Sequence, residues 1–169
     1  GINFYDVRNL DNLLMAVDKV NLKKPIFIKM PIDQTDVHTL KMLKVISKHK
    51  VQGVIFGNLQ TNKKNKVLVQ QEVNKFKMGK YSGKPTFEDS NRLIRLAFKN
   101  FKNRFVIIGT GGVFNAEDAW TKFVNGASLL QLITGMIFEG PQLIAQINRD
   151  LSKKLQKEGY KNISEIVGS

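Results

Sequence analysis

The stretch that decides the fold is Val106-Ile107-Ile108-Gly109-Thr110-Gly111-Gly112-Val113, and Leu130-Gln131-Leu132-Ile133-Thr134-Gly135 echoes it. Each is a short apolar run that ends in glycine and small hydroxyl residues before a helical pattern begins. Apolar runs bounded by glycine are typical of fully buried parallel strands. Glycine lets the backbone approach a ligand, and the N–H groups of the turn then point at that ligand. Two such turns in succession indicate the phosphate site of a (β/α)8 barrel, with two ordinary strand-to-helix turns as the alternative.

Working outward from this stretch, buried strands alternate with helices along the chain. The strands are predicted near residues 25–30, 52–56, 105–108 and 128–132, and the helices near 7–20, 36–46, 92–101, 116–123 and 141–157. This alternation predicts an α/β fold with a parallel sheet. Four strand-helix units are half of an eight-stranded barrel. We therefore expect residues 1–169 to form roughly the second half of a (β/α)8 TIM barrel.

Two features of this half-barrel need explanation. Four buried strands cannot close on themselves, and their open edges invite aggregation. We expect a complement, either an N-terminal half of the same or a nicked chain or a second copy pairing edge to edge. Residues 59–85 form a polar excursion too long for a simple connection, so we expect a long loop insertion that acts as a lid or mobile segment.

Composition excludes several function classes. The chain has 169 residues, 42% of them hydrophobic, which suits one globular domain. No apolar run approaches the roughly 20 residues that span a bilayer. Without cysteine there is no disulfide, thiolate nucleophile or cysteine-based metal site. His38 and His49 lie in a lysine-rich helical pattern and are interpreted as exposed helix residues, so no metal site is predicted.

The chain is strongly basic, with a formal net charge of +13. Such a charge permits binding to nucleic acid or to an anionic membrane. The lysines are spread along the whole chain, however, and the one dense cluster, Lys63-Lys64-Asn65-Lys66, has no aromatic residues among it. The pattern favours a solvated basic surface that suits an anionic small molecule, and no nucleic-acid partner is predicted.

A set of motifs, taken in order and spacing, resembles the dihydroorotate dehydrogenase family. They are Pro25–Met30 with its lysine Lys29, Gly53–Asn58, Tyr81–Pro85, Ile107–Val113 and Gly126–Gln131. The long loop after Asn58 and the ending Gly159–Gly168 are similar to the membrane-associated, quinone-reducing class 2. The resemblance covers nearly the whole chain, from about Gly1 to Ser169. Each motif alone is weak, because several FMN-binding barrels carry a similar glycine turn.

The resemblance implies FMN-dependent oxidation of dihydroorotate to orotate in pyrimidine biosynthesis, with electrons passed to a quinone. Lys29 matches a strand-end lysine beside the flavin, where an ammonium stabilises the charge of a flavin receiving hydride. Lys29 is therefore the expected catalytic residue. Asn58 matches an asparagine that hydrogen-bonds the orotate ring. The expected FMN contacts are Lys29, Gly57, Gly83, Gly111, Gly112, Ile133, Thr134 and Gly135.

The resemblance also implies parts that lie outside this chain. In class 2 the catalytic base is a serine on a loop of the first half-barrel, and Gly1-Ile2-Asn3 is expected to follow that loop. Ser82 and Ser128 are better explained as turn residues. The quinone site is expected in the N-terminal region. The implied location is peripheral, on the cytoplasmic side of the inner membrane or on the mitochondrial inner membrane.

The sequence departs from the family pattern beside the proposed ligands. Gly57 and Leu59 flank Asn58 where the family usually has threonines, and Ile133-Thr134 replaces a usual Tyr-Ser pair. Gly79-Lys80-Tyr81 replaces the usual Gly-Gly-Leu. These departures favour one alternative, another FMN- or phosphate-ligand barrel enzyme. A non-catalytic, diverged half-barrel is a second alternative, and a basic nucleic-acid binder, supported by charge alone, is a third.

Overall fold

Four parallel strands form a sheet in the order β1-β2-β3-β4, so that each strand pairs with the next one along the chain. The strands are β1 (Phe27–Lys29), β2 (Gly53–Phe56), β3 (Val106–Thr110) and β4 (Leu129–Gln131). The structure is a computed structural model that describes residues 3–20 and 22–169. The expectation placed on Gly1 and Ile2 therefore lies outside the described residues.

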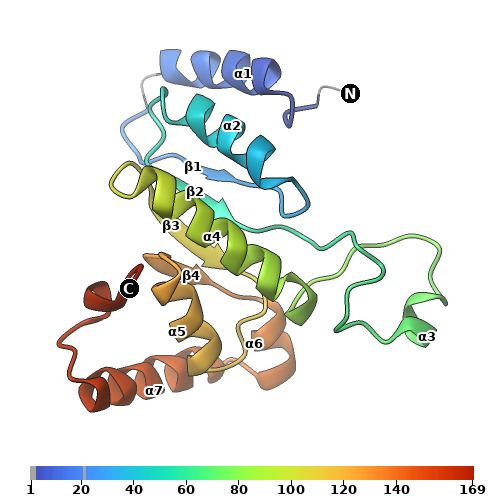
Figure 1. Ribbon diagram of the computed structural model, residues 1–169, viewed down its shortest axis with the longest axis vertical. Helices are drawn as coiled ribbons and strands as arrows, with labels where there is room; N and C mark the ends of the chain where they lie inside the picture. The colour runs from blue at the N-terminus through green and yellow to red at the C-terminus, as the bar shows by residue number, and fades with distance from the viewer. Residues whose placement is uncertain (1–2, 21) are drawn as a thin grey trace.

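Helices precede the first strand, connect successive strands and follow the last one (Figure 1). They are α1 (Val7–Lys19), α2 (Asp36–Ile46), α3 (Gln70–Val73), α4 (Phe87–Phe101), α5 (Ala116–Val124), α6 (Thr134–Glu139) and α7 (Leu143–Glu158), with short 3-10 helices at η1 (Lys84–Thr86) and η2 (Ile163–Ile166). The predicted parallel β/α alternation is confirmed.

Local sequence explains where the helices begin. The side chains of Asp6, Thr35 and Asn115 each accept a backbone N–H from the first turn of α1, α2 and α5. Helix α4 begins five residues before the predicted position. Pro85 in the preceding 3-10 turn and the acidic residues Glu88 and Asp89 in its first turn both favour a helix start here.

The strand bounds differ slightly from the prediction. Strand β1 is shorter than residues 25–30, although the Met30 N–H just beyond it still donates to the Ile55 carbonyl at 2.9 Å. Strand β3 runs two residues further than expected, through Gly109 and Thr110, where it pairs with β4. The glycine-rich segment therefore starts directly at the end of a paired strand.

The two faces of the sheet differ in burial. One face packs against α2, α4 and α5, and its residues Val54, Phe56 and Ile107 are at most 1% exposed. The opposite face carries Ile108 in register with Leu129, which is 54% exposed. Because side chains alternate along a strand, the second face is a separate apolar layer, as expected for the interior of an incomplete barrel.

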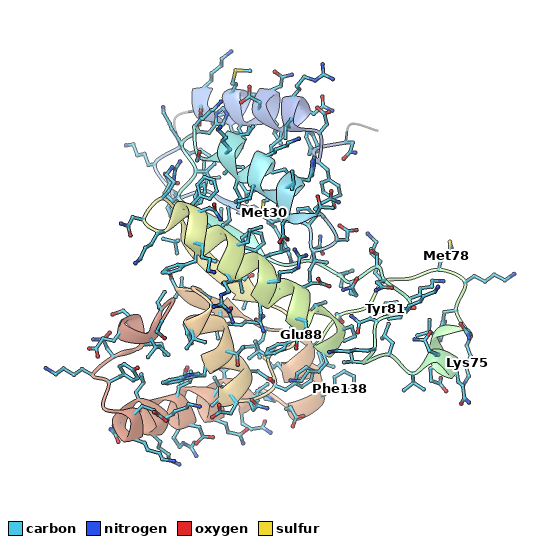
Figure 2. The ribbon with its side chains drawn as sticks, viewed as in Figure 1. Met30, Lys75, Met78, Tyr81, Glu88 and Phe138 are labelled. Carbon is cyan, nitrogen blue, oxygen red and sulfur yellow. The ribbon has the colours of Figure 1, made fainter. Side chains whose placement is uncertain are left out.

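Residues 59–85 extend away from the sheet as a long arm with the short helix α3 in it (Figure 1). Gln60 and Tyr81 exchange backbone hydrogen bonds of 2.8 and 2.9 Å at the base of the arm. Gln60 is buried, and its amide donates to Asp89 of α4 at 2.7 Å. Figure 2 shows Met78 and Lys75 far from the sheet, and Met78 is 88% exposed. The base of the arm is therefore fixed and its tip is solvated.

One histidine prediction is wrong. His49 lies beyond the C-terminus of α2, its side chain is only 7% exposed, and its two ring nitrogens contact Asp11 and Asp18 at 2.9 and 2.8 Å. The error arose because these partners lie 31 and 38 residues away in sequence. His38, which is half-buried on α2, contacts the Tyr5 carbonyl at 2.7 Å.

Candidate functional site

A cleft lies at the carboxyl ends of the four strands. Five chain segments line it: Lys29 at the end of β1, Gly57–Leu59 after β2, Ser82, Gly83 and Thr86 near the end of the arm, Thr110–Val113 at the end of β3, and Leu132–Gly135 after β4. Ligands of parallel α/β proteins bind at this end of the strands. All the residues predicted from the sequence to contact cofactor or substrate are brought together here.

The backbone conformation and the close packing of the cleft wall require glycine at several positions. Gly111 and Gly112 have φ angles of +100° and +74°, which side-chain-bearing residues rarely adopt. A Cβ on Gly111 would lie 2.2 Å from Thr86 Oγ1, and one on Gly135 would lie 2.2 Å from the Val113 carbonyl oxygen. Any substitution would therefore disturb the wall as well as a ligand, which the sequence alone did not indicate.

The same turns present backbone donors to the cleft. Within residues 3–20 and 22–169, no protein acceptor is found for the backbone N–H groups of Gly111, Gly112 and Thr134. The half-buried Thr134 adds a hydroxyl beside them. Polar N–H groups next to an open cleft bind water or a ligand acceptor, and several together suit an anion.

Lys29 and Asn58 lie on the same cleft, at the carboxyl ends of the adjacent strands β1 and β2. Lys29 is exposed and, in the part of the chain that the structure describes, has no carboxylate within ion-pair distance. Asn58 Oδ1 accepts the Leu59 backbone N–H at 2.9 Å. This bond fixes the side chain through its oxygen and leaves the amide nitrogen available to donate to a ligand.

Polar contacts behind the cleft hold its loops in place. The buried hydroxyl of Thr86 donates to the Gly83 carbonyl at 2.7 Å. Lys84 Nζ lies 2.6 Å from both carboxylate oxygens of Asp118 on α5. Asp118 also accepts the backbone N–H of Phe114 at 2.9 Å. The segments after the arm and after β3 are therefore tied to the same carboxylate.

Sequence reasoning missed one further group, the lysine Lys122. It lies on the buried face of α5, at helical spacing from Ala119 and beside Phe123, and it is 0% exposed. Burial lowers the pKa of Lys122 from 10.5 to about 7, with Lys84 acting in the same direction and Asp118 and Glu88 opposing it. The sequence signal that could have identified Lys122 is its place inside an apolar helical stripe, beside Ala119 and Phe123.

Comparison with known proteins decides the family. The sequence model of the family described as dihydroorotate dehydrogenase matches residues 1–155. The chain belongs to the dihydroorotate dehydrogenase family. Curated relatives named "Dihydroorotate dehydrogenase (quinone)" occur in Crocosphaera subtropica, 38% identical over 94% of this chain, and in Trichodesmium erythraeum, 33% identical over 95%.

Solved structures agree on the fold. A ligand-free dihydroorotate dehydrogenase from Eimeria tenella matches 98% of this chain with a TM-score of 0.87 at 20% identity. The same enzyme in complex with ferulenol matches with a TM-score of 0.86 at 21% identity. This chain spans 51% and 49% of those two chains, and 43% and 44% of the two curated relatives. The predicted half of a TIM barrel is confirmed.

The dihydroorotate dehydrogenase family is flavin-dependent, so the cleft must be compared with FMN. In the described part of the chain, the residues that carry three unpaired N–H groups and the Thr134 hydroxyl line the same cleft, where glycines keep the wall free of Cβ atoms. This donor set fits a phosphate dianion. Lys29, at the other side of the cleft, supplies a positive charge that suits the flavin ring. The residues present therefore fit FMN.

Proposed function

We propose that this chain carries the FMN phosphate site and part of the substrate site of a quinone-dependent dihydroorotate dehydrogenase. The observation that carries the proposal is the convergence of Lys29, Asn58 and the glycine turns on one cleft. The names of the relatives support the substrate and the quinone. Because the chain spans less than half of those relatives, we further propose that residues 1–169 act together with an N-terminal half-barrel.

The proposed roles follow from the chemistry of each group. The N–H groups of Gly111, Gly112 and Thr134 and the Thr134 hydroxyl hold the phosphate, with Gly83, Ile133 and Gly135 beside them. Each hydrogen bond to a charged phosphate is worth roughly 1.5–3 kcal/mol. Gly57 lets the backbone after β2 lie close to the flavin ring. Backbone donors dominate this set, so replacement of the family's usual Tyr-Ser pair by Ile133-Thr134 leaves phosphate binding intact.

The reaction divides between this chain and its complement. FMN, when bound, supplies the acceptor for the hydride of dihydroorotate. The Lys29 ammonium stabilises the negative charge that develops on that acceptor. This electrostatic stabilisation is strongest when water is excluded from the cleft. Asn58 donates its amide hydrogen to the substrate ring and orients it. The proton lost with the hydride goes to a base outside this chain, the serine expected in the N-terminal half.

The proposal also covers the arm at residues 59–85 and the quinone site. We assign residues 59–85 as an insertion within the half-barrel whose fixed base, at Gln60 and Tyr81, borders the substrate side of the cleft. Among residues 3–20 and 22–169, no helix has the length and apolar character to cross a bilayer. We propose, from the family resemblance and the names of the relatives, that the quinone site lies in the N-terminal part.

The test uses the complete barrel, meaning this chain together with the N-terminal half that closes the sheet. Flavin absorbance is followed anaerobically after mixing the FMN-loaded complete barrel with dihydroorotate. Bleaching within the enzyme's turnover time supports the proposal, and recovery of the colour on adding a quinone supports the electron acceptor. A flavin that stays oxidised in excess dihydroorotate would contradict it.

The second candidate is another FMN barrel enzyme. Gly57 and Leu59 favour it, because they put a glycine and a 42%-exposed leucine beside Asn58. Under this alternative the complete barrel binds FMN but ignores dihydroorotate. The same bleaching experiment therefore separates the two functions.

A further inference from the structure

A buried polar cluster lies directly behind the cleft. Lys122 Nζ on α5 donates to Ser90 Oγ at 2.9 Å and to Asn91 Oδ1 at 3.0 Å, both on α4. It also lies 5.0 Å from the centre of the Phe87 ring. Lysine is almost never fully buried without partners, and here the partners are neutral side chains.

Ser90 connects this amine to the ends of two strands. Its Oγ lies 2.7 Å from the carbonyl oxygen of Thr110 and 3.2 Å from that of Phe56. A hydroxyl has one proton to donate. Since Lys122 donates to the oxygen of Ser90, the proton of that hydroxyl is directed to the two carbonyls.

These carbonyls are next to the cleft. Thr110 precedes Gly111, and Phe56 precedes Gly57, and both glycines line the cleft. The stem of Lys122 passes behind the same strands, since a Cβ on Gly109 would lie 3.1 Å from Lys122 Cδ. The amine therefore supports the ends of β2 and β3 from the side opposite the ligand.

Ion pairing does not explain why the Lys122 amine is buried here. The charged groups that face it are Asp118 on α5, Glu88 on α4 and Lys84 on η1. Asp118 is already bonded to Lys84 and to the Phe114 N–H. With a pKa of about 7, Lys122 is uncharged in a large fraction of molecules near neutral pH. A neutral amine still has two N–H groups, which match its two acceptors.

A contribution to the stability of the fold does not explain the buried lysine either. Replacing a buried charged group by an apolar residue of similar volume is often neutral or stabilising. Methionine would fill the same space between α4, α5 and the sheet. What methionine cannot do is direct the hydroxyl of Ser90 to the two strand-end carbonyls.

We propose that Lys122 is a positioning residue that acts through Ser90 to hold the peptides after Phe56 and Thr110 where FMN binds. This inference rests on the proposed function of the cleft. It assigns Lys122 no contact with the flavin or the substrate.

The test is a double-mutant cycle in the complete barrel. FMN dissociation constants are measured by quenching of flavin fluorescence for the unsubstituted protein, K122M, S90A and the double variant, and the melting temperature of each flavin-free protein is recorded. K122M is expected to weaken FMN binding about tenfold or more while its melting temperature stays level or rises. S90A is expected to lose a similar factor, and the double variant no more than either single one.

A matched control comes from α7. Lys154 bonds to Glu117 of α5 at 2.5 Å and lies over the Trp120 ring, away from the cleft. K154M also removes a partly buried amine from the α5 layer, and it should leave the FMN dissociation constant unchanged. Amide exchange at Asn58 and Gly112 is a second measurement, and it should speed up in K122M and not in K154M.

The following results of these experiments would contradict the inference. Unchanged FMN binding and amide exchange in K122M would overturn the inference while leaving the proposed function standing. Additive losses in the double variant would overturn the route through Ser90. If K122M does not fold, S90A decides, because unchanged binding by S90A then overturns the inference. An unsubstituted complete barrel that does not bind FMN would overturn the proposed function and this inference with it.

Discussion

At the scale of single residues, the cleft separates a charge from a set of neutral donors. Lys29 is exposed at the end of β1, whereas the backbone donors follow β3 and β4. A fixed cation such as Lys29 can stabilise negative charge that develops during a reaction. Backbone N–H groups suit the negative charge that a phosphate group always carries. The two parts of the cleft are therefore expected to respond differently to substitution.

Lys29→Met keeps the side-chain stem and removes the ammonium. We expect FMN affinity to change little and flavin reduction by dihydroorotate to slow about a hundredfold or more, as when one preorganised donor is removed from an active site. Stopped-flow bleaching of the complete barrel measures the rate. Lys44→Met, at an exposed position of α2, is the control. Equal rates for the two variants would exclude a catalytic role for Lys29.

Asn58→Asp tests the substrate contact. The new side chain keeps an oxygen to accept the Leu59 N–H, so the turn should persist. The lost N–H donor, worth roughly 1.5–3 kcal/mol to a charged ligand, should raise the dihydroorotate dissociation constant at least tenfold. FMN affinity should not change. Parallel losses of substrate and FMN would mean that the turn itself had collapsed.

At the scale of elements, α1 packs on the core through Leu10 and Leu14, and His49 adds a polar link to it. His49 contacts Asp11 and Asp18, both on α1, and Lys50 donates its backbone N–H to Asp18 at 2.9 Å. Burial alone would lower the pKa of His49, but the hydrogen bonds to the two aspartates outweigh it and raise the pKa above 6.5. The hydrogen bond from His49 in turn lowers the pKa of Asp18.

The attachment of α1 should therefore depend on pH. A histidine whose pKa is raised in the folded state contributes stability that is fully present below its unfolded pKa of 6.5 and is lost as pH rises through the folded value. Amide exchange in α1 should accelerate across this window relative to α4. His49→Gln should remove the dependence. A titration of His49 followed by NMR with a midpoint below 6.5 would contradict this account.

The same elements explain how far sequence reasoning reached. Strands and helices were predictable because their signals, apolar runs and caps, are local. Glycines directly after strands pointed to the cleft, whereas Lys29 and Asn58 were identified through the family resemblance. The partners of His49, Gln60 and Lys122 were not predictable, because each lies about 30 residues or more from its partner in sequence. A local pattern gives the face of a helix but not what the neighbouring element places against it. The need for glycine at position 111 likewise depends on Thr86 across the cleft.

At the scale of the whole molecule, the chain exposes more surface than its mass warrants. Its accessible surface is 10510 Å², whereas a compact monomer of 19.2 kDa exposes about 8,400 Å². The arm at 59–85 contributes part of the excess. The rest includes apolar side chains along β3 and β4, such as Val106 at 39% and Leu129 at 54% exposed, and both β1 and β4 are edge strands.

Residues 1–169 expressed alone should therefore aggregate or bind hydrophobic dyes without a cooperative melt. Burying apolar surface stabilises a fold by about 25 cal/mol per Å². If several hundred Å² stay exposed to water, on the order of ten kcal/mol of stabilisation is lost, which is comparable to the stability of a domain. Co-expression with the N-terminal half should restore a cooperative transition in calorimetry. A monodisperse, cooperatively melting monomer of the isolated chain would show that the open face needs no complement.

The central claim is that the turns after β3 and β4 bind the phosphate of FMN, and one titration tests it most directly. The flavin-free complete barrel is titrated with FMN and with riboflavin, which has the same ring and ribityl chain but no phosphate. Two or more hydrogen bonds of charged strength predict that FMN binds about a hundredfold tighter or better. Equal dissociation constants for FMN and riboflavin would contradict the account.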